Sequence, residues 1–195
     1  VITQDDVLRA VLALGNVVQA RIDPASTYAA LRVIVVLADR QPADKFVLEE
    51  LEERLQAVMP LAAGCAVELV DVKQRPVHVV LDVTVNRGFF EGDVILGLEK
   101  AFSAAKDGFF ELRRWPIGAP LRVGEIYEQA FALPGVATAR VRWLSTEVAP
   151  LNLPTKVPDI LWPGPEEIIR CDSDRMDDPY RARGSFRVQV KRGGK

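Results

Sequence analysis

The sequence holds few of the residues that build metal sites and disulfides. Among its 195 residues are two cysteines, Cys65 and Cys171, and a single histidine, His78. Neither cysteine has a second metal ligand at a fitting spacing, so we expect both to be small core side chains in a reducing compartment. His78 alternates with Asp82 and Thr84 in an extended run. That pattern predicts an outward-pointing side chain with neither a metal nor a catalytic role.

The sequence also lacks a strong net charge and a long apolar run. Its formal net charge is −2, which favours neither nucleic acid nor an anionic membrane as a partner. No apolar stretch approaches twenty residues, so we expect no membrane insertion. The chain opens on Val1, without a methionine or a signal peptide, which indicates a piece of a longer protein.

Sequence motifs for catalysis are missing as well. There is no glycine-rich phosphate loop, no nucleophile elbow, no metal-ligand cluster and no Cys–His pair. The acidic run DSDRMDD at residues 172–178 lacks the glycine and the bidentate glutamate of a calcium loop. Glu49, Glu50, Glu52 and Glu53 lie on one face of an expected helix and are typical of a solvated surface. We therefore expect a binding or structural protein rather than an enzyme, with no catalytic residue, metal or cofactor.

What the sequence does contain is organised around the stretch Leu121–Ser145. It predicts an amphipathic helix, a break at Pro134-Gly135, and then a strand. Proline ends the helix, and we expect Gly135 to adopt a positive φ that lets the chain reverse.

The first part of the chain repeats this helix–turn–strand plan. A shift of 119 positions places residues 13–22 on residues 132–141 without a gap, with five identities. A second similarity, at a shift of 47, relates the helix around Leu51 to the helix around Leu98. The pieces recur in a different order in the two halves, which favours genuine internal similarity over the chance recurrence of a common motif.

These patterns predict an α+β protein with two related small subdomains, each a mixed sheet with helices packed on one side. We place the first subdomain at residues 1–74 and the second at residues 75–148. Five of the sixteen residues from Pro150 to Pro165 are proline. Residues 149–195 are therefore expected to form a proline-rich arm followed by a terminal hairpin.

The hairpin is predicted from two strand patterns, Glu167–Cys171 and Phe186–Lys191, around the loop Asp172–Gly184. The last fifteen residues hold six basic side chains and no acid. Their alternation with Phe186, Val188 and Val190 is more typical of a half-buried edge strand guarded by cations than of a nucleic-acid arm.

Capping and periodicity signals predict the other elements. Thr3 and Asp6 form a capping-box pattern at the first helix, and Asp44 begins the second helix, which Pro60 ends. The remaining expected elements are strands at Val17–Ile22, Leu31–Leu37, Ala66–Val72 and Val77–Val85, and a helix from Val94 to Phe102.

A loop with large apolar side chains is expected between the two helices of the second half. It contains Phe109, Phe110, Trp115 and Pro116. Such residues either plug the core from outside or await a partner, and the sequence alone leaves both readings open. We predict a partner interface formed by these four residues and by Trp162, which stands in the proline-rich segment.

The stretch Trp115–Arg140, WPIGAPLRVGEIYEQAFALPGVATAR, resembles the C-terminal part of the baseplate J-like family. The N-terminal VITQDD with the following strand, and the strand and helix of Val77–Phe102, are similar to that family too. The resemblance covers about residues 1–145 and leaves residues 150–195 unmatched.

The resemblance implies a structural wedge subunit of a contractile phage tail or injection system, without catalysis. It implies two copies per wedge in a six-fold baseplate. The partners would be other wedge proteins, a second J-like copy, and hub or sheath-proximal proteins, with no nucleic acid. Cytoplasmic assembly would precede incorporation into the particle.

Two alternatives remain open at this point. The first is an α+β module that binds a small molecule or a peptide, in a regulatory or enzymatic role, which would need a pocket with convergent polar groups. The second is nucleic-acid binding through the basic tail, which the acidic balance of the rest of the chain disfavours.

Overall fold

The computed structural model describes residues 3–27, 30–38, 43–59, 66–172 and 183–191. The chain is an α+β protein with four helices and several mixed sheets in that described part, so the expected fold class is confirmed. It divides into two compact units, Val1–Lys73 and Gln74–Lys195, here called unit 1 and unit 2. None of the helices in the described ranges has the length and apolar character needed to span a bilayer.

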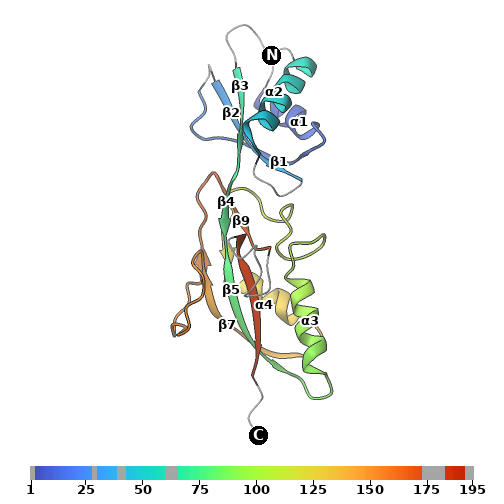
Figure 1. Ribbon diagram of the computed structural model, residues 1–195, viewed down its shortest axis with the longest axis vertical. Coiled ribbons are helices and arrows are strands. Elements are labelled where there is room, and N and C mark those ends of the chain that lie inside the picture. Colours follow the sequence, from blue (N-terminus) through green and yellow to red (C-terminus); the bar gives the residue numbers. More distant parts are fainter. Residues whose placement is uncertain (1–2, 28–29, 39–42, 60–65, 173–182, 192–195) are drawn as a thin grey trace. The chain divides into compact units, whose positions relative to one another are not determined.

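Unit 1 packs two helices against a three-stranded sheet (Figure 1). The sheet order is β1-β2-β3, with β1 and β2 antiparallel and β2 and β3 parallel, so the sheet is mixed. The elements of unit 1, in chain order, are α1 (Gln4–Leu12), β1 (Val17–Ile22), β2 (Ala30–Leu37), α2 (Lys45–Val58) and β3 (Ala66–Asp71).

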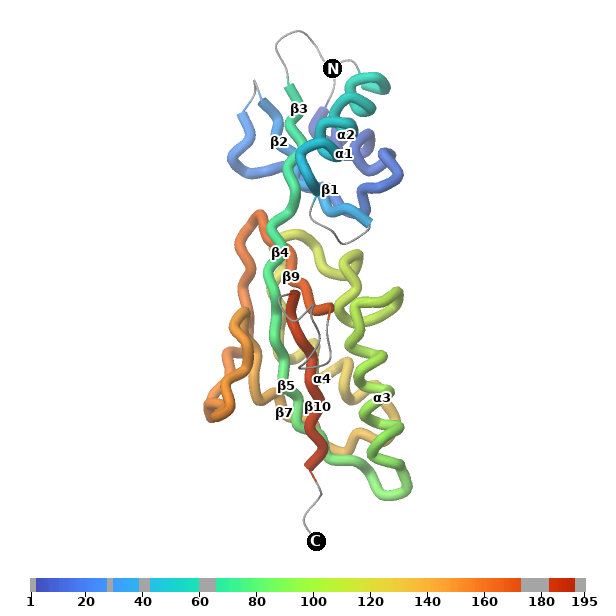
Figure 2. The backbone as a smooth tube through the Cα atoms, in the orientation of Figure 1, coloured from blue at the N-terminus to red at the C-terminus, as the bar shows by residue number. Residues whose placement is uncertain are grey.

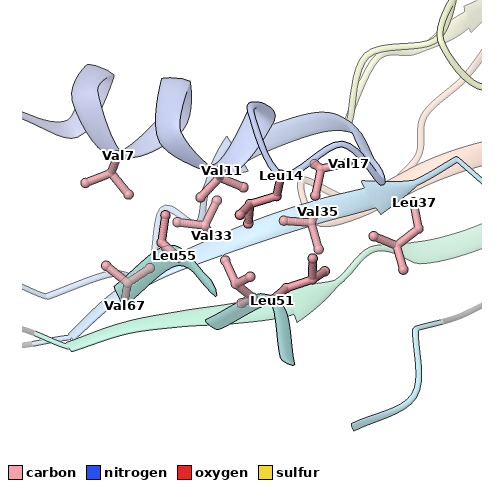
Figure 3. Close-up of a cluster of buried hydrophobic side chains, with 11 residues drawn as sticks. Val7, Val11, Leu14, Val17, Val33, Val35, Leu37, Leu51, Leu55 and Val67 are labelled. Carbon is pink, nitrogen blue, oxygen red and sulfur yellow. The ribbon is translucent and has the colours of Figure 1, made fainter. Parts of the chain in front are cut away.

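The core of unit 1 forms because each element has an apolar side. Val7 and Val11, four residues apart on α1, point toward the alternate residues Val33 and Val35 of β2 (Figure 3). Residues four apart on a helix lie on one face, and alternate residues of a strand lie on one side of a sheet. The apolar face of α1 can therefore pack against one side of β2. Leu51 of α2 lies in the same cluster.

The first helix begins with the expected capping box. The backbone N–H of Asp6 donates to Thr3 Oγ1 at 3.2 Å, and the backbone N–H of Thr3 donates to Asp6 Oδ2 at 2.9 Å. The Thr3 backbone and side-chain donors lower the pKa of the Asp6 carboxyl from its ordinary 3.8. Asp44 caps α2 in a simpler way, accepting from the backbone N–H of Val47 at 2.9 Å.

Unit 2 is built around a second three-stranded mixed sheet, in the order β10-β5-β7. β10 runs parallel to β5, and β7 runs antiparallel to it (Figure 2). Two short strand pairs, β4-β9 and β6-β8, complete the unit. Its elements, in chain order, are β4 (Lys73–Pro76), β5 (His78–Val85), α3 (Glu91–Ala101), β6 (Leu121–Arg122), α4 (Val123–Phe131), β7 (Val136–Ser145), β8 (Ile160–Leu161), β9 (Glu167–Arg170) and β10 (Ser185–Val190).

The strand pairings of the two sheets follow the same register, in keeping with the predicted internal similarity. β1 pairs with β2 through Val17–Leu37 and then Gln19–Val36, which leaves one extra residue on β1. β7 pairs with β5 through Val136–Val85 and then Thr138–Thr84, with the extra residue at the equivalent place. The parallel pairs start alike, at Ala30–Ala66 in unit 1 and at His78–Ser185 in unit 2. Strands β1 and β3 of unit 1 therefore reappear 119 positions later as β7 and β10.

The helices correspond in the same way. α1 and α4 are both nine residues long and lie 119 positions apart. The backbone N–H of Arg122 donates to Glu125 Oε2 at 2.8 Å, as that of Thr3 does to Asp6. The order along the chain differs between the units. In unit 1 the helix–strand pair α1–β1 comes before the strand–helix pair β2–α2. In unit 2 the helix–strand pair α4–β7 comes after the strand–helix pair β5–α3. The units are thus two arrangements of one α+β unit with its segments permuted.

The C-terminal region departs from the prediction. β9 and β10 do not pair as a hairpin, since β9 pairs with β4 and β10 extends the sheet beside β5. Residues 149–195 belong to unit 2 instead of forming a separate arm. The physical reason is that β5 has a free edge that a C-terminal strand can fill, a long-range pairing invisible in local patterns. Most of the loop between β9 and β10, including the acidic run after Asp172, lies outside the described residues.

Candidate protein–protein interface

The aromatic loop after α3 is part of the core of unit 2. Phe109 and Phe110 are each 1% exposed and Trp115 is 5% exposed. The Phe109 ring centroid lies 5.1 Å from that of Phe102 and 5.3 Å from that of Trp115. Phe102 in turn stacks on Phe186 of β10, with centroids 4.3 Å apart. The expectation that these three loop rings are exposed was therefore wrong, and they plug the core.

A tight turn explains how loop residues reach the core. Asp107 adopts a φ of 66°, and Gly108 packs so closely on Ser103 that a β-carbon would not fit there. The turn brings the backbone N–H of Phe109 to the carbonyl of Ala101, at 2.8 Å. Trp115 Nε1 donates to the carbonyl of Phe109 at 2.7 Å, which satisfies its only polar atom. The loop thus folds back over the end of α3.

A groove remains on the outer side of this loop, where it faces α4. Its volume is 370 Å³, and its walls include Trp115, Pro116, Arg122, Glu125 and Glu128. Pro116 is exposed, in agreement with its expected place on the surface. The groove mixes apolar walls with both signs of charge, so it fits a polypeptide better than a purely apolar ligand.

Trp162 remains an interface candidate. Its side chain is 67% exposed, and it directly follows β8, which pairs antiparallel with β6. The backbone N–H of Val123 donates to the carbonyl of Asp159 at 2.9 Å, just before β8. After the ring, Glu167 accepts from the backbone N–H of Gly164 at 2.7 Å. The indole is therefore held on ordered backbone and presented to solvent.

A second set of exposed apolar side chains was missed by the sequence reasoning. Phe90 is 80% exposed, Leu96 is 65% exposed and Phe131 is 53% exposed, and all three lie on the helices of unit 2 or at their ends. The helical period was the available signal for Leu96, which lies away from the buried stripe of Val94 and Leu98 on α3. The equivalent of this exposed set in unit 1 includes Leu12, which is 45% exposed and corresponds to Phe131.

The candidate polar residues do not form a chemical site. His78 is 3% exposed, not outward-pointing, and its Nδ1 lies 2.8 Å from Ser185 Oγ. The neighbouring β10 explains this burial, because it covers the edge of β5 that the sequence left open. Across the ranges that the structure describes, no group of three or more His, Cys, Asp or Glu side chains could hold a metal ion. Cys171 is buried and is in no disulfide among the described residues, and Cys65 lies outside them.

No family model matches the sequence, and no curated protein matches it either. The fold has a match among solved structures. A chain in the cryo-electron microscopy structure of the anti-feeding prophage baseplate, six-fold symmetrised, aligns with a TM-score of 0.53 at 15% identity. The alignment covers 88% of this chain and 38% of the baseplate chain. This chain therefore shares its fold with a part of a baseplate protein.

Proposed function

We propose that the chain is a structural subunit of a contractile tail or injection-system baseplate, acting by protein–protein assembly and without catalysis. The single observation that carries the proposal is the fold match over 88% of the chain to a baseplate component. The resemblance of residues 1–145 to the baseplate J-like family leads to the same role by a separate route.

Within that role we assign the chain to the wedge as the C-terminal region of a J-like protein. Its partners would be other wedge proteins, a second J-like copy, and hub or sheath-proximal proteins of a six-fold assembly. Assembly in the cytoplasm would precede incorporation into the particle. The surface supports such contacts, because assembly interfaces use buried aromatic anchors with a polar rim.

Trp162 is our choice of anchor for a neighbouring subunit. A large ring held on paired backbone loses little conformational freedom on binding, which is what distinguishes a hot spot from an ordinary exposed side chain. Phe90 supplies a second exposed ring, and Pro116 lies on the rim of the groove beside Trp115.

The test is purification of the native particle from its source with tube and sheath proteins, followed by electron microscopy. The chain should co-purify and occupy the baseplate. Trp162→Ser should weaken incorporation by about 2–4 kcal/mol if the ring is a hot spot, whereas Trp162→Phe should retain most of it. A chain absent from particles that otherwise contain tube and sheath would remove the proposal.

The groove beside Trp115 favours a second candidate, a peptide-binding module of regulatory or enzymatic type. Its 370 Å³ lies in the size range of ligand sites, and Arg122, Glu125 and Glu128 offer polar contacts. This candidate predicts a monomer purified with a ligand in the groove. A chain recovered in particles with an empty groove would decide against it.

A further inference from the structure

The α4 wall of the groove beside Trp115 is one face of that helix. Its lining residues are spaced three or four positions apart, and such residues share a helix face. They are Glu125, Glu128, Gln129 and Ala132. The Glu125 carboxylate serves the helix cap, since it accepts from the backbone N–H of Arg122 at 2.8 Å. The Glu128 side chain is exposed and has no ion pair or hydrogen bond to another described residue.

The opposite wall is held rigid by prolines. Pro116 and Pro120 line it together with Trp115. Trp115 is fixed by its hydrogen bond to the carbonyl of Phe109, and the backbone N–H of Ala119 donates to the carbonyl of Pro116 at 2.9 Å. Proline also restricts the backbone, because its ring fixes φ. The groove is therefore already formed in the free chain, and a ligand would not have to order its walls.

Trp162 stands at one end of this groove. Leu121 of β6 lies opposite Leu161 of β8, and both are buried. Neighbouring residues of an extended strand point to opposite sides. Pro120 and Trp162 flank this pair and therefore point away from the buried side, in agreement with the 67% exposure of Trp162. Since Pro120 lines the groove, the Trp162 ring continues the groove wall at the β6 end.

The charged residues of the groove are set apart along α4. Arg122 caps the start of α4, Glu128 lies six positions later, and both line the groove. A helix rises about 1.5 Å per residue, which separates the two by about 9 Å along its axis. A polyproline II segment rises about 3.1 Å per residue, so about three of its residues span that distance. The groove thus matches a segment that brings an acidic residue to Arg122 and a basic residue to Glu128.

We propose that the groove and Trp162 form a docking site for an extended, proline-containing segment of a partner protein. The segment would have an acidic and a basic residue three positions apart, with prolines between them. Proline-rich segments bind in grooves lined by aromatic side chains, because the polyproline II conformation is largely formed before binding. The Trp162 ring provides an apolar surface for one of the prolines. The inference rests on the proposed function for the source of the segment, a neighbouring baseplate protein, whereas the groove determines the segment's chemistry.

The test is fluorescence anisotropy of labelled peptides titrated with the full chain. One peptide contains Glu-Pro-Pro-Lys and another contains the reverse, Lys-Pro-Pro-Glu, because the groove leaves the direction of the segment open. At least one of them should bind saturably. The same peptide with Ala-Ala in place of Pro-Pro should bind about tenfold more weakly, since it loses more conformational freedom on binding.

Variants of the chain locate the contact. Trp162→Ala should weaken binding about tenfold or more, because it removes the exposed ring. Glu128→Lys should weaken it about threefold or more, since an attraction becomes a repulsion. A peptide whose lysine is changed to glutamate should bind the Glu128→Lys chain as the original peptide binds the wild type. Glu50→Lys, exposed on α2 of unit 1, makes the same charge change and should leave the affinity unaltered.

Circular dichroism and thermal unfolding show whether every chain is folded. The absence of saturable binding by both proline peptides, or an equal affinity for the Ala-Ala peptide, overturns the proposal. An unchanged affinity in Trp162→Ala, or no recovery with the charge-exchanged peptide, overturns it too. Peptide binding in the groove of a chain absent from baseplate particles would retain the docking site and remove the proposed function. Incorporation into particles by a chain that binds neither proline peptide would do the reverse.

Discussion

Gly184 lies directly against the backbone of Val77. Its φ is 96°, and a β-carbon added to it would lie 2.5 Å from the carbonyl oxygen of Val77 and would also overlap that of Arg170. Both carbonyls are already bonded, Val77 accepting from the N–H of Ser185 at 3.0 Å and Arg170 from the N–H of Val77 at 2.9 Å. The start of β10 beside β5 therefore requires a glycine.

Gly184→Ala should destabilise unit 2 by more than about 3 kcal/mol, because left-handed strain adds to a clash with backbone that cannot move. Urea unfolding, followed by circular dichroism, gives the free energy. Gly88→Ala is the matched control, since Gly88 has the same φ of 96° but nothing within 4 Å of an added β-carbon. It should cost only the strain, about 1–2 kcal/mol. Equal losses in the two variants would contradict the clash argument.

Gly135→Val should also destabilise the protein, by about 1–3 kcal/mol. The predicted positive φ of Gly135 is confirmed at 96°, and an added β-carbon would lie 2.8 Å from the Phe89 ring and 2.9 Å from Val94. Phe89 is 49% exposed and can give way, so the cost should be smaller than at Gly184. The melting temperature measures it, and an unchanged value would refute the claim. Gly15→Val, with φ 62° and no close neighbour, separates strain from contact.

Local signals in the sequence were enough to predict most elements. The helix expected from Thr3 and Asp6 begins at Gln4, and the strand expected at Val17–Ile22 has those bounds. Helix caps, the helical period and strand alternation depend on residues within a few positions of one another. These signals can therefore be recognised in the sequence without the structure. The similarity at a shift of 119 was predictable for the same reason, because both copies keep their local patterns.

The errors were at long-range contacts. β10 pairs with β5, more than 100 residues earlier, and nothing near Ser185 specifies that partner. His78 was expected to face solvent because its strand seemed one-sided, yet β10 covers it. Phe109 and Trp115 were expected at an interface because the turn signal Asp107-Gly108 predicts a chain reversal and does not specify which core the following rings enter. Of the predicted interface residues, Trp162 and Pro116 are exposed, and Trp162 was chosen because it stands in the proline-rich segment.

Trp115 and Trp162 make a direct test of core against surface. Trp115→Ala should cost about 3–5 kcal/mol of unfolding free energy, since it removes a buried ring that contacts Phe109 and leaves a cavity. Trp162→Ala should change stability by no more than about 0.5 kcal/mol, because its ring is mostly in solvent. Chemical denaturation of the isolated chain distinguishes them. A large loss for Trp162→Ala would show that this ring, too, packs in the fold.

The Asp6 carboxyl should titrate below its ordinary pKa of 3.8. Because the folded state lowers this pKa, the stabilisation is present at neutral pH and is lost as pH falls through the folded value. Carbon-detected NMR of the side-chain carboxyl reads the titration directly. Thr3→Val should raise the Asp6 pKa toward normal, since it removes the hydroxyl donor but keeps the Thr3 backbone donor. A Thr3→Val chain in which Asp6 titrates as it does in the wild type would contradict the assignment.

The last prediction concerns the ion pair of Arg170 and Asp172 after β9. The Arg170 side chain is 2% exposed, and its Nε donates to Asp172 Oδ2 at 2.8 Å. Gln74 of β4 accepts a further hydrogen bond from the same guanidinium, which ties β9 to β4.

Asp172→Ala removes a buried ion-pair partner of that guanidinium and should cost about 3–5 kcal/mol. Replacing both residues, Arg170→Met with Asp172→Leu, should cost much less, because no uncompensated charge then remains in the interior. Lys45→Ala breaks an exposed pair with Glu49 and should cost no more than about 0.5 kcal/mol. Urea unfolding of the four chains gives the comparison. A double variant as unstable as Asp172→Ala would show that the pair matters for its specific geometry and not for its charge balance.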